Sequence, residues 1–384
     1  MESLVVVGGG YAGVLAAVRA QHALGGRAQV TLVSEREAFV ERIRNHQLAS
    51  GQALPSVSVA KLASQGGVRL VLGRMTGLDA ARSSITLSDG TVLPYARLML
   101  APGSRAAVDV DGAEHAYSLE AESARQLAAR LDAGAERLLV VGGGLCGLEA
   151  ATELAEAHPQ VAVTLVSRGP VDRCLVQGAA LHLRRVLARL GVTLVEGVGV
   201  AALSAGQARL SDGRTLDFDA CLWAGGFVAA PLAASVGLPT NALGQALVDD
   251  RLRSLGAPAI YVVGDAAGLT QSAGSPVEMS CRSAMPMGAH AADNAVAAML
   301  GGAEKPFRYR EAGICISLGR HDAIVQTRQQ QGGPGWLWFG GRLGAAVKEW
   351  ICRYTVGSID KEASHRRRYR WLAGTPRATP RLSA

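Results

Sequence analysis

The sequence has no two cysteines close enough to act together locally. Its six cysteines stand at positions 146, 174, 221, 281, 315 and 352. None is spaced from another as Cys-x-x-Cys or Cys-x-x-x-x-Cys, so a local redox disulfide and a zinc knuckle have no support, and we expect no metal site. We interpret the cysteines as buried free thiols in a reducing cytoplasm, which predicts a cytoplasmic protein.

Long apolar runs are also lacking. Glycines or acidic residues interrupt the longest of them, and all fall short of the roughly 20 residues that a membrane-spanning helix needs. We expect no signal peptide, because the first predicted strand already begins at Leu4. A hydrophobic content of 49% with 47 glycines fits an α/β protein and excludes disorder of the whole chain.

An excess of positive charge is confined to the C-terminal end. The net charge is +7, and from Lys361 onward there are seven basic residues and one acidic residue. A basic tail can contact anionic lipid or an acidic partner, but a solvated chain end is the simpler interpretation. We expect no nucleic-acid partner and do not favour contact with a membrane surface, and the oligomeric state stays open.

The N-terminal stretch joins a buried strand to a glycine turn. Val5 to Val7 are β-branched and uninterrupted, as in a strand buried on both faces of a parallel sheet. A Gly-x-Gly-x-x-Gly turn and a helix follow. The residues of this turn are Gly8, Gly10, Tyr11, Ala12 and Gly13. Such a turn lets the backbone and the helix N-terminus approach a pyrophosphate, so it predicts dinucleotide binding.

The residues after this turn complete the first nucleotide-binding unit. A second strand at 29–33 is followed by Glu35, one residue later than usual for the acid that binds ribose hydroxyls. We expect Arg42 or Arg44 near the cofactor phosphates or adenine, whereas a lone His46 is more typical of a hydrogen-bonded structural residue. The strand at 97–100 ends in Ala101-Pro102-Gly103, where the backbone comes close to a partner.

The whole unit then repeats. A strand at 137–141, the turn Gly142-x-Gly144-x-x-Gly147, a helix and a second strand at 161–166 follow in the same order. The second strand ends in Ser167 and Arg168, with no carboxylate for a 2′-hydroxyl. An arginine at this place suits a 2′-phosphate, so the pattern favours NADPH over NADH. Two such units in one chain predict two bound nucleotides.

Matching hairpins follow both units, so the two halves look like copies. The hairpins lie at 84–93 and 210–216, and the second leads to a strand that ends near Gly225. A further buried strand at 259–263 ends in Gly264 and Asp265, where an aspartate can accept hydrogen bonds from a sugar-like chain or cap a helix. We predict an α/β fold with two nested Rossmann-like domains and a small α+β C-terminal segment.

The predicted domains follow from these units. They are a first FAD-binding part at 1–115, an NAD(P)H-binding domain at 116–244, a second FAD-binding part at 245–302 and a C-terminal segment with a basic tail at 303–384. In that last segment we expect a hairpin from Cys315 to Gln326 and a helix from Gly341 to Tyr354. An apolar stripe on this helix can lie against the flavin domain, a second subunit or lipid. We favour packing against protein over contact with lipid. The stripe is Leu343, Val347, Trp350, Ile351 and Tyr354.

These motifs together resemble the two-dinucleotide-binding flavoproteins of the pyridine nucleotide-disulfide oxidoreductase superfamily, and among them the type II NADH dehydrogenase-like branch. The resemblance covers residues 3 to 355. It implies that the first glycine motif, Glu35, Gly103, Gly264 and Asp265 bind FAD, and that the second motif with Ser167, Arg168 and Gly225 binds NAD(P)H. It also implies that Glu149 lies near the nicotinamide, as a catalytic residue.

The resemblance also predicts a helix whose N-terminus points at the flavin. It implies a helix from Ala289 to Leu300 with its N-terminus at the flavin pyrimidine ring, Met285 before it and Pro286 at its start. The match has two gaps, because no cysteine pair lies between Arg36 and Ser56, and Arg282, Pro286 and Met287 stand where membrane quinone reductases carry glutamines.

The sequence thus predicts a FAD-dependent NAD(P)H oxidoreductase that passes electrons to a small organic acceptor, a quinone or an aromatic metabolite. Lys348 and Trp350 border the acceptor pocket in this interpretation. The alternatives are a flavin monooxygenase and a slow-turnover NAD(P)H-sensing flavoprotein that acts through a partner.

Overall fold

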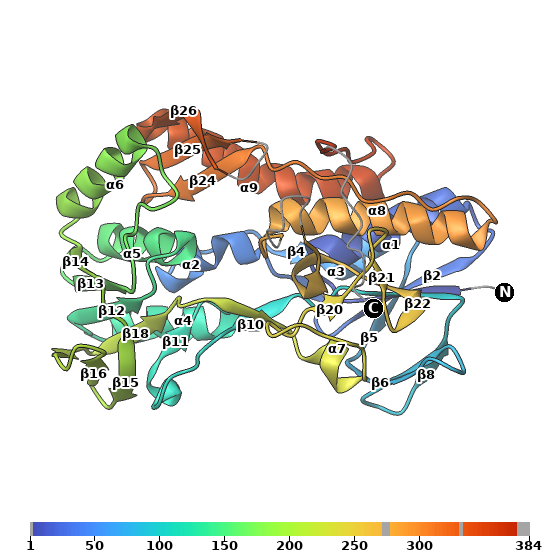
Figure 1. Ribbon diagram of the computed structural model, residues 1–384, viewed down its shortest axis with the longest axis horizontal. Coiled ribbons are helices and arrows are strands. Elements are labelled where there is room, and N and C mark those ends of the chain that lie inside the picture. Colours follow the sequence, from blue (N-terminus) through green and yellow to red (C-terminus); the bar gives the residue numbers. More distant parts are fainter. Residues whose placement is uncertain (1–2, 271–276, 330–332, 375–384) are drawn as a thin grey trace, which may run out of the picture.

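The protein is built from two lobes, each around a parallel sheet. The computed structural model describes residues 3–270, 277–329 and 333–374. Figure 1 shows the lobe of β12 (Arg137–Val141) on the left and the lobe of β2 (Gln29–Ser34) on the right, with the C-terminal strands above the left lobe and helix α9 (Gly341–Ala363) continuing toward the right. The C-terminal segment therefore spans both lobes.

The first lobe contains the first predicted nucleotide-binding unit. Its sheet has the order β21-β22-β9-β1-β2-β5, and all neighbours are parallel except β21 and β22. The strands are β1 (Ser3–Val7), β2 (Gln29–Ser34), β5 (Arg69–Leu72), β9 (Arg97–Leu100), β21 (Arg253–Ser254) and β22 (Ala257–Val262). The helices are α1 (Tyr11–Leu24), α3 (Val59–Gln65) and α8 (Cys281–Met299). Leu4, Val5 and Val6 are at most 1% exposed, as a central strand requires.

The second lobe repeats this arrangement. Its sheet has the order β11-β18-β12-β13-β14 and is parallel throughout. The strands are β11 (Tyr117–Ser118), β12 (Arg137–Val141), β13 (Ala162–Ser167), β14 (Thr193–Glu196) and β18 (Ala220–Trp223). The helices are α4 (Ala121–Asp132), α5 (Leu145–Ala157) and α6 (Gln177–Arg189). The predicted α/β fold with two Rossmann-like units is confirmed.

Each lobe also carries a three-stranded antiparallel sheet, which contains the predicted hairpin. These sheets are β6 (Met75–Asp79), β7 (Ser84–Leu87) and β8 (Val92–Pro94) in the first lobe, and β15 (Val200–Ser204), β16 (Gln207–Leu210) and β17 (Thr215–Asp217) in the second. The chain passes between the lobes through β10 (Ser104–Ala106) and β19 (Phe227–Ala229), which pair antiparallel.

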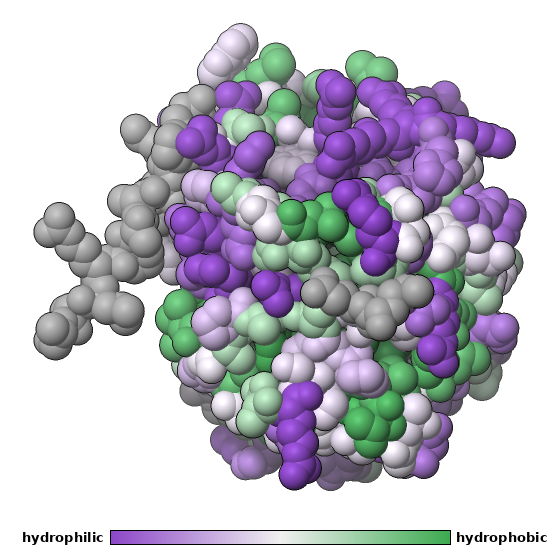
Figure 2. Space-filling model, turned by 90° about the vertical axis from the view of Figure 1, so that its right-hand side faces the viewer, coloured by the Kyte–Doolittle hydropathy of each residue, from purple (hydrophilic) through white to green (hydrophobic). Residues whose placement is uncertain are grey.

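Short elements complete the two lobes. They are β3 (Ala38–Phe39), η1 (Arg42–Arg44), α2 (Asn45–Ala49), β4 (Val57–Ser58), η2 (Ala113–His115), α7 (Leu232–Ser235), β20 (Ala246–Leu247), η3 (Gly264–Ala266) and β23 (Ala267–Gly268). Figure 2 shows the end of the first lobe, where hydrophobic and hydrophilic side chains are interspersed. No helix within the described ranges is both long and apolar enough to cross a membrane.

Helix α8 begins earlier than the sequence analysis predicted. Its first residue is Cys281, eight residues before the expected start at Ala289, and Pro286 lies inside the helix. The start is explained by a cap, because the Ser280 hydroxyl accepts a hydrogen bond from the Ser283 N–H at 3.4 Å. The prediction that Pro286 occupies the first turn was therefore wrong.

The C-terminal segment forms an antiparallel sheet and a long helix. The predicted hairpin is confirmed as β24 (Gly313–Ser317) and β25 (Ala323–Arg328), and a third strand that we did not predict, β26 (Pro334–Gly340), pairs with β25. Helix α9 (Gly341–Ala363) continues nine residues beyond the predicted end.

The buried face of α9 differs from the predicted one. Leu343, Trp350 and Tyr354 are 66%, 62% and 38% exposed, so most of the expected stripe does not pack within the chain. The buried face instead contains small residues such as Gly344, where a Cβ would lie 2.8 Å from the carbonyl oxygen of Ala323. A close approach of backbones, rather than an apolar stripe, determines how this helix lies.

Helices α1 and α8 also pack closely, which generates a stability prediction. A Cβ on Gly288 would lie 2.4 Å from the carbonyl oxygen of Ala12, whereas a Cβ on Gly357 in α9 would meet nothing within 4 Å. We expect Gly288→Ala to destabilise the fold by about 1–3 kcal/mol through overpacking. Gly357→Ala should be neutral or stabilising by up to about 1 kcal/mol, because alanine favours the helix. Thermal unfolding followed by circular dichroism measures both, and equal Tm values would contradict this packing.

Candidate active site

The first glycine turn is fixed by two close backbone approaches. Gly8 has a φ of +122°, and a Cβ there would lie 2.1 Å from the carbonyl oxygen of Ala101, just after β9. A Cβ on Gly13 would lie 1.9 Å from the carbonyl oxygen of Gly8. Only glycine fits at both positions, so the turn, the neighbouring strand and α1 are held together.

The second glycine turn has the same geometry. Gly142 has a φ of +117°, and a Cβ there would lie 2.4 Å from the carbonyl oxygen of Ala224. A Cβ on Gly147 would lie 1.8 Å from the carbonyl oxygen of Gly142. Gly225, which follows this strand end, lies against the indole of Trp223, whose Nε1 donates to the carbonyl of Ala107 at 2.8 Å.

The middle glycine of each turn faces open space. Gly10 and Gly144 are the N-caps of α1 and α5, and neither helix has a side-chain capping bond. A Cβ built on either glycine meets nothing within 4 Å. Two helix N-termini are therefore free to bind an anion, as the pyrophosphate of a dinucleotide requires.

Both second strands end in a serine that shapes the following turn. Ser34 donates a hydrogen bond to the carbonyl of Arg36 and Ser167 to the carbonyl of Gly169, both at 2.7 Å. Ser167 is 7% exposed. The hydroxyl of Ser167 is thus bonded within its own turn.

The next residue in each unit is exposed and differs in charge. Glu35 follows Ser34 in the first unit, and Arg168 follows Ser167 in the second. The Arg168 stem lies over Gly199, where a Cβ would come within 3.1 Å of its Cγ. Glu196, at the end of the neighbouring strand β14, is paired with Arg184 at 3.0 Å. At this edge of the second sheet, Arg168 is therefore exposed, and the negative charge of the nearby Glu196 is neutralised by Arg184.

A buried carboxylate oxygen marks the carboxyl end of the first sheet. Asp265 accepts a hydrogen bond from the Ser104 hydroxyl at 2.6 Å through Oδ2, while its Oδ1 is buried without a partner in the described part of the chain. Arg42 donates to the carbonyl of Ser104 at 2.5 Å and lies near Gly103, which has a φ of +75°. Gly264, with a φ of +69°, precedes the aspartate. A buried lone acceptor of this kind fits a sugar hydroxyl.

Three further predicted residues lie buried on α1 and α8. Tyr11 is 7% exposed, and its ring meets Phe39 edge-on at 5.0 Å between centroids. Burial raises the pKa of Tyr11 well above its ordinary value, so the hydroxyl is protonated. Ala12 packs under Gly288, and Met285 is 2% exposed near the start of α8.

Glu149 on α5 forms a buried ion pair with the C-terminal segment. Its Oε1 accepts from the Lys348 ammonium at 2.6 Å and from the Ser317 N–H at 3.1 Å, and Lys348 also donates to the carbonyl of Cys315 at 3.1 Å. Burial works to raise the pKa of Glu149, but Lys348 and the hydrogen bonds outweigh it and lower that pKa. The same pairing raises the pKa of Lys348 against its burial. Both groups are therefore charged.

The thiols nearby are protonated. Burial raises the pKa of Cys146 and Cys315 to about 12 and that of Cys281 to about 11. All six cysteines are free. Because a thiolate is the reactive form, these three residues offer no nucleophile at neutral pH.

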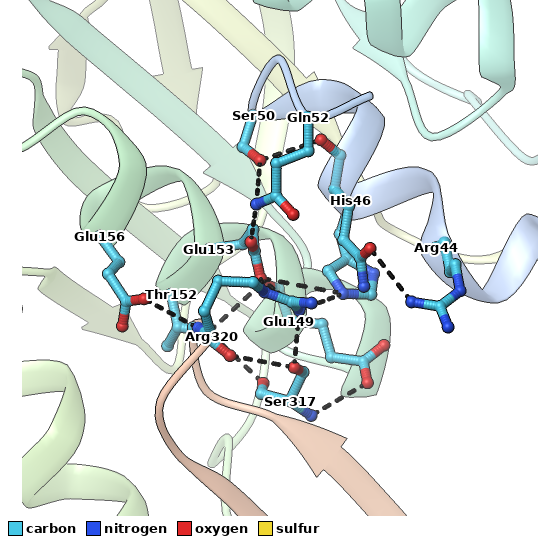
Figure 3. A network of polar contacts seen from close by, with 12 residues as sticks. Arg44, His46, Ser50, Gln52, Glu149, Thr152, Glu153, Glu156, Ser317 and Arg320 are labelled. Atoms are coloured by element: carbon cyan, nitrogen blue, oxygen red, sulfur yellow. Dashed lines mark hydrogen bonds and ion pairs between the residues drawn. The ribbon is translucent and has the colours of Figure 1, made fainter. Parts of the chain in front are cut away.

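A second buried carboxylate lies one helical turn further along α5. Glu153 is 1% exposed and pairs with Arg320 at 2.7 Å, and Gln52 donates a hydrogen bond to it. His46, 3% exposed, places Nε2 4.0 Å from Glu153 and 3.4 Å from Arg320. Figure 3 shows His46 projecting from α2 toward α5, between Glu149 and the pair of Glu153 and Arg320.

Two adjoining hollows reach this network from the surface. The outer hollow has a volume of about 530 Å³ and the inner one about 230 Å³, and they share Gln47, Arg320 and Glu349. The outer hollow is lined by Glu41, Arg44, Gln47, Gln52, Ala53, Leu54, Pro55, Arg320, Glu349, Arg353, Val356 and Gly357. The inner hollow is lined by Gln47, Ser317, Arg320, Ala345, Lys348, Glu349 and Cys352. Lys348 thus connects the inner hollow to Glu149.

Several residues of this site were not expected from the sequence. Ser104, Ser317 and Arg320 were not singled out, and His46 was interpreted as structural. No local pattern marks these residues, because Ser317 and Arg320 meet α5 across more than 160 positions of sequence.

Comparisons with known proteins agree with this architecture. The pattern of the pyridine nucleotide-disulphide oxidoreductase family matches residues 2–295. A NADH dehydrogenase-like protein of Mycobacterium tuberculosis is 30% identical over 323 residues, which are 77% of this chain and 80% of the relative. The alternative NAD(P)H-ubiquinone oxidoreductase C1 of Arabidopsis thaliana is 26% identical over 400 residues, covering 90% of this chain and 76% of the relative.

A solved structure with the same fold covers nearly the whole chain. The sulfide:quinone oxidoreductase of Aquifex aeolicus superposes with a TM-score of 0.82 at 18% identity and covers 95% of this chain and 92% of that one. The extent of the family match, the 30% identity and the duplicated nucleotide-binding geometry lead to one conclusion. The chain belongs to the pyridine nucleotide-disulphide oxidoreductase family and is an oxidoreductase of its NADH dehydrogenase-like branch.

Proposed function

We propose that this protein is a FAD-dependent NAD(P)H oxidoreductase that acts in the cytoplasm and delivers electrons to a small organic acceptor. The observation that carries the proposal is the pair of open helix N-termini at Gly10 and Gly144, one on each parallel sheet. One anion-binding turn suits a single dinucleotide, whereas two matched turns suit a flavin dinucleotide and a pyridine dinucleotide.

The first lobe fits FAD. The free helix N-terminus suits the pyrophosphate, and the buried unpartnered Oδ1 of Asp265 suits a hydroxyl of the ribityl chain. We assign to FAD the domain at 1–115 and 245–302, and within it Gly8, Gly10, Tyr11, Ala12, Gly13, Glu35, Arg42, Ala101, Gly103, Gly264, Asp265 and Met285. When bound there, FAD would supply a two-electron carrier between NAD(P)H and the acceptor.

The second lobe fits NAD(P)H, and we propose NADPH as the preferred donor. The assigned residues, in the domain at 116–244, are Gly142, Gly144, Gly147, Ser167, Arg168 and Gly225. Arg168 stands where Glu35 stands in the first unit, so the two units offer opposite charges to a ribose edge. A guanidinium attracts a 2′-phosphate, and pairing with Arg184 keeps the Glu196 carboxylate from repelling it.

The inner hollow fits the acceptor. Lys348 contributes to its wall and holds Glu149, so an acceptor there would meet an ammonium donor backed by a buried carboxylate. Lys348 would donate a hydrogen bond or a proton through Nζ to an acceptor carbonyl, and Glu149 would keep that ammonium charged and oriented. Names of two relatives point to quinones, namely the ubiquinone oxidoreductase of Arabidopsis thaliana and the sulfide:quinone oxidoreductase of Aquifex aeolicus. We therefore propose a quinone or an aromatic metabolite with a carbonyl group as the acceptor.

Anaerobic reduction of the purified protein tests this function. We expect a yellow protein whose visible flavin absorption bleaches on addition of NADPH, because both nucleotides would be held in one chain. A water-soluble benzoquinone added afterwards should restore the absorption. A protein without flavin, or flavin that NADPH and NADH both fail to bleach, would contradict the proposal.

The preference for NADPH is tested by reversing the charge of Arg168. Because a charge-assisted hydrogen bond contributes about 1.5–3 kcal/mol, Arg168→Glu should lower the ratio of kcat/KM for NADPH to that for NADH about 10-fold or more. Arg82→Glu is the matched control, since Arg82 has an 86% exposed side chain on a hairpin of the other lobe. An Arg168→Glu ratio equal to that of the control would remove the basis for the preference.

A further inference from the structure

His46 is a buried histidine that has no role in the function proposed above. It projects from the short helix α2 into the space between the two buried carboxylates of α5 (Figure 3). These carboxylates, Glu149 and Glu153, lie four residues apart and therefore on one face of the helix. Each has a cationic partner from the C-terminal segment, Lys348 for the first and Arg320 for the second.

The contacts of His46 assign its two ring nitrogens. Arg320 can only donate, so its approach to Nε2 at 3.4 Å makes Nε2 the acceptor in that contact. The proton of the neutral ring is then on Nδ1. Burial lowers the pKa of His46 to about 4, with Lys348, Arg320 and Arg44 acting in the same direction and Glu149 against them. A neutral imidazole accepts a proton at one nitrogen while giving one up at the other.

The outer hollow is linked to this ring through Glu153, and the acceptor site is linked to it through Glu149. Gln52 and Arg320 line the outer hollow, and both bind Glu153, which is 4.0 Å from Nε2 of His46. Figure 3 shows the imidazole also lying next to the Glu149 side chain, and in keeping with this position each of the two groups shifts the pKa of the other. Glu149 in turn holds Lys348 in the wall of the inner hollow.

We propose that Glu153 and His46 form a proton relay from the outer hollow to Glu149 and Lys348. A proton from water in the outer hollow passes by way of Glu153 to Nε2 of His46, and the proton on Nδ1 moves on to Glu149, which restores the ammonium of Lys348. A small rotation of the imidazole or one water closes the 4.0 Å gap to Glu153. This inference rests on the proposed function, because it supplies the acceptor with a proton.

The relay accounts for the second proton that the overall reaction needs. NAD(P)H gives up a hydride, which is two electrons and one proton. A dicarbonyl acceptor needs two electrons and two protons to become its dihydroxy form. The second proton comes from solvent, and Lys348 gives it to the acceptor oxygen and recovers it through Glu149, His46 and Glu153. His46 and Glu153 are positioning residues in this scheme, since they act through Glu149 and Lys348.

The test separates electron transfer from proton supply. We would prepare the holoenzyme of His46→Ala and of Glu153→Gln, with His158→Ala as the control, because His158 is also buried, at 8% exposure, but lies at the far end of α5. Stopped-flow measurement gives flavin reduction by NADPH, reoxidation by a water-soluble benzoquinone, and reoxidation by ferricyanide, which takes electrons without protons.

We expect reduction by NADPH and reoxidation by ferricyanide to stay within about twofold of wild type in every variant. Reoxidation by the benzoquinone should slow about 10- to 100-fold in His46→Ala and Glu153→Gln, as loss of positioned proton transfer does. Added imidazole should restore the rate of His46→Ala, and His158→Ala should behave as wild type.

Several results would overturn the relay. They are unchanged benzoquinone rates in both relay variants, equal slowing with ferricyanide, or slowing of His46→Ala that imidazole does not relieve. If His46→Ala or Glu153→Gln fails to fold, His46→Gln, which keeps a polar side chain of similar size without a titratable ring, decides by the same comparison. Wild-type protein that NADPH cannot reduce would instead refute the proposed function, so the two failures are distinguishable.

Discussion

The architecture depends on the contact between a helix and the glycine turn before it. A Cβ on Gly13 or on Gly147 would lie less than 2 Å from a carbonyl oxygen of the turn, so only glycine allows the helix to start so close to the strand. This approach leaves the middle glycine at the open N-terminus of the helix, and its free N–H groups can bind a phosphate. Because both lobes have the contact, the chain offers two such sites.

A second constraint is the burial of charge between the second lobe and the C-terminal segment. Removing one member of a buried ion pair typically costs about 3–5 kcal/mol, because the other charge is left uncompensated. Glu149 with Lys348 and Glu153 with Arg320 therefore fix β24, β25 and α9 against α5. Lys348 and Arg320, the cations of these two pairs, line the inner hollow. The groups that we assign to proton supply therefore also hold the C-terminal segment in place beside the proposed acceptor site.

The sequence predicts the parts of the structure that are local. Each glycine turn needs only a strand, three glycines and a helix within about ten residues, so both units and their hairpins were correctly expected. The start of α8 and the buried face of α9 were not, because a serine cap and the close approach of Gly344 to Ala323 overrode the apolar pattern. His46, Ser317 and Arg320 reach the site only through contacts between distant segments, and no spacing in the sequence signals such contacts.

We propose that the two turns bind two different nucleotides, and substitutions at the open glycines test this assignment. Gly10 and Gly144 have extended backbones with φ of −93° and −74°, and nothing lies within 4 Å of a Cβ there, so valine should leave the fold intact and fill only the phosphate space. The measurement is bound flavin per chain and its reduction by NADPH. We expect a folded, colourless Gly10→Val and a yellow Gly144→Val that NADPH reduces poorly. Flavin retained in Gly10→Val, or lost in Gly144→Val alone, would contradict it.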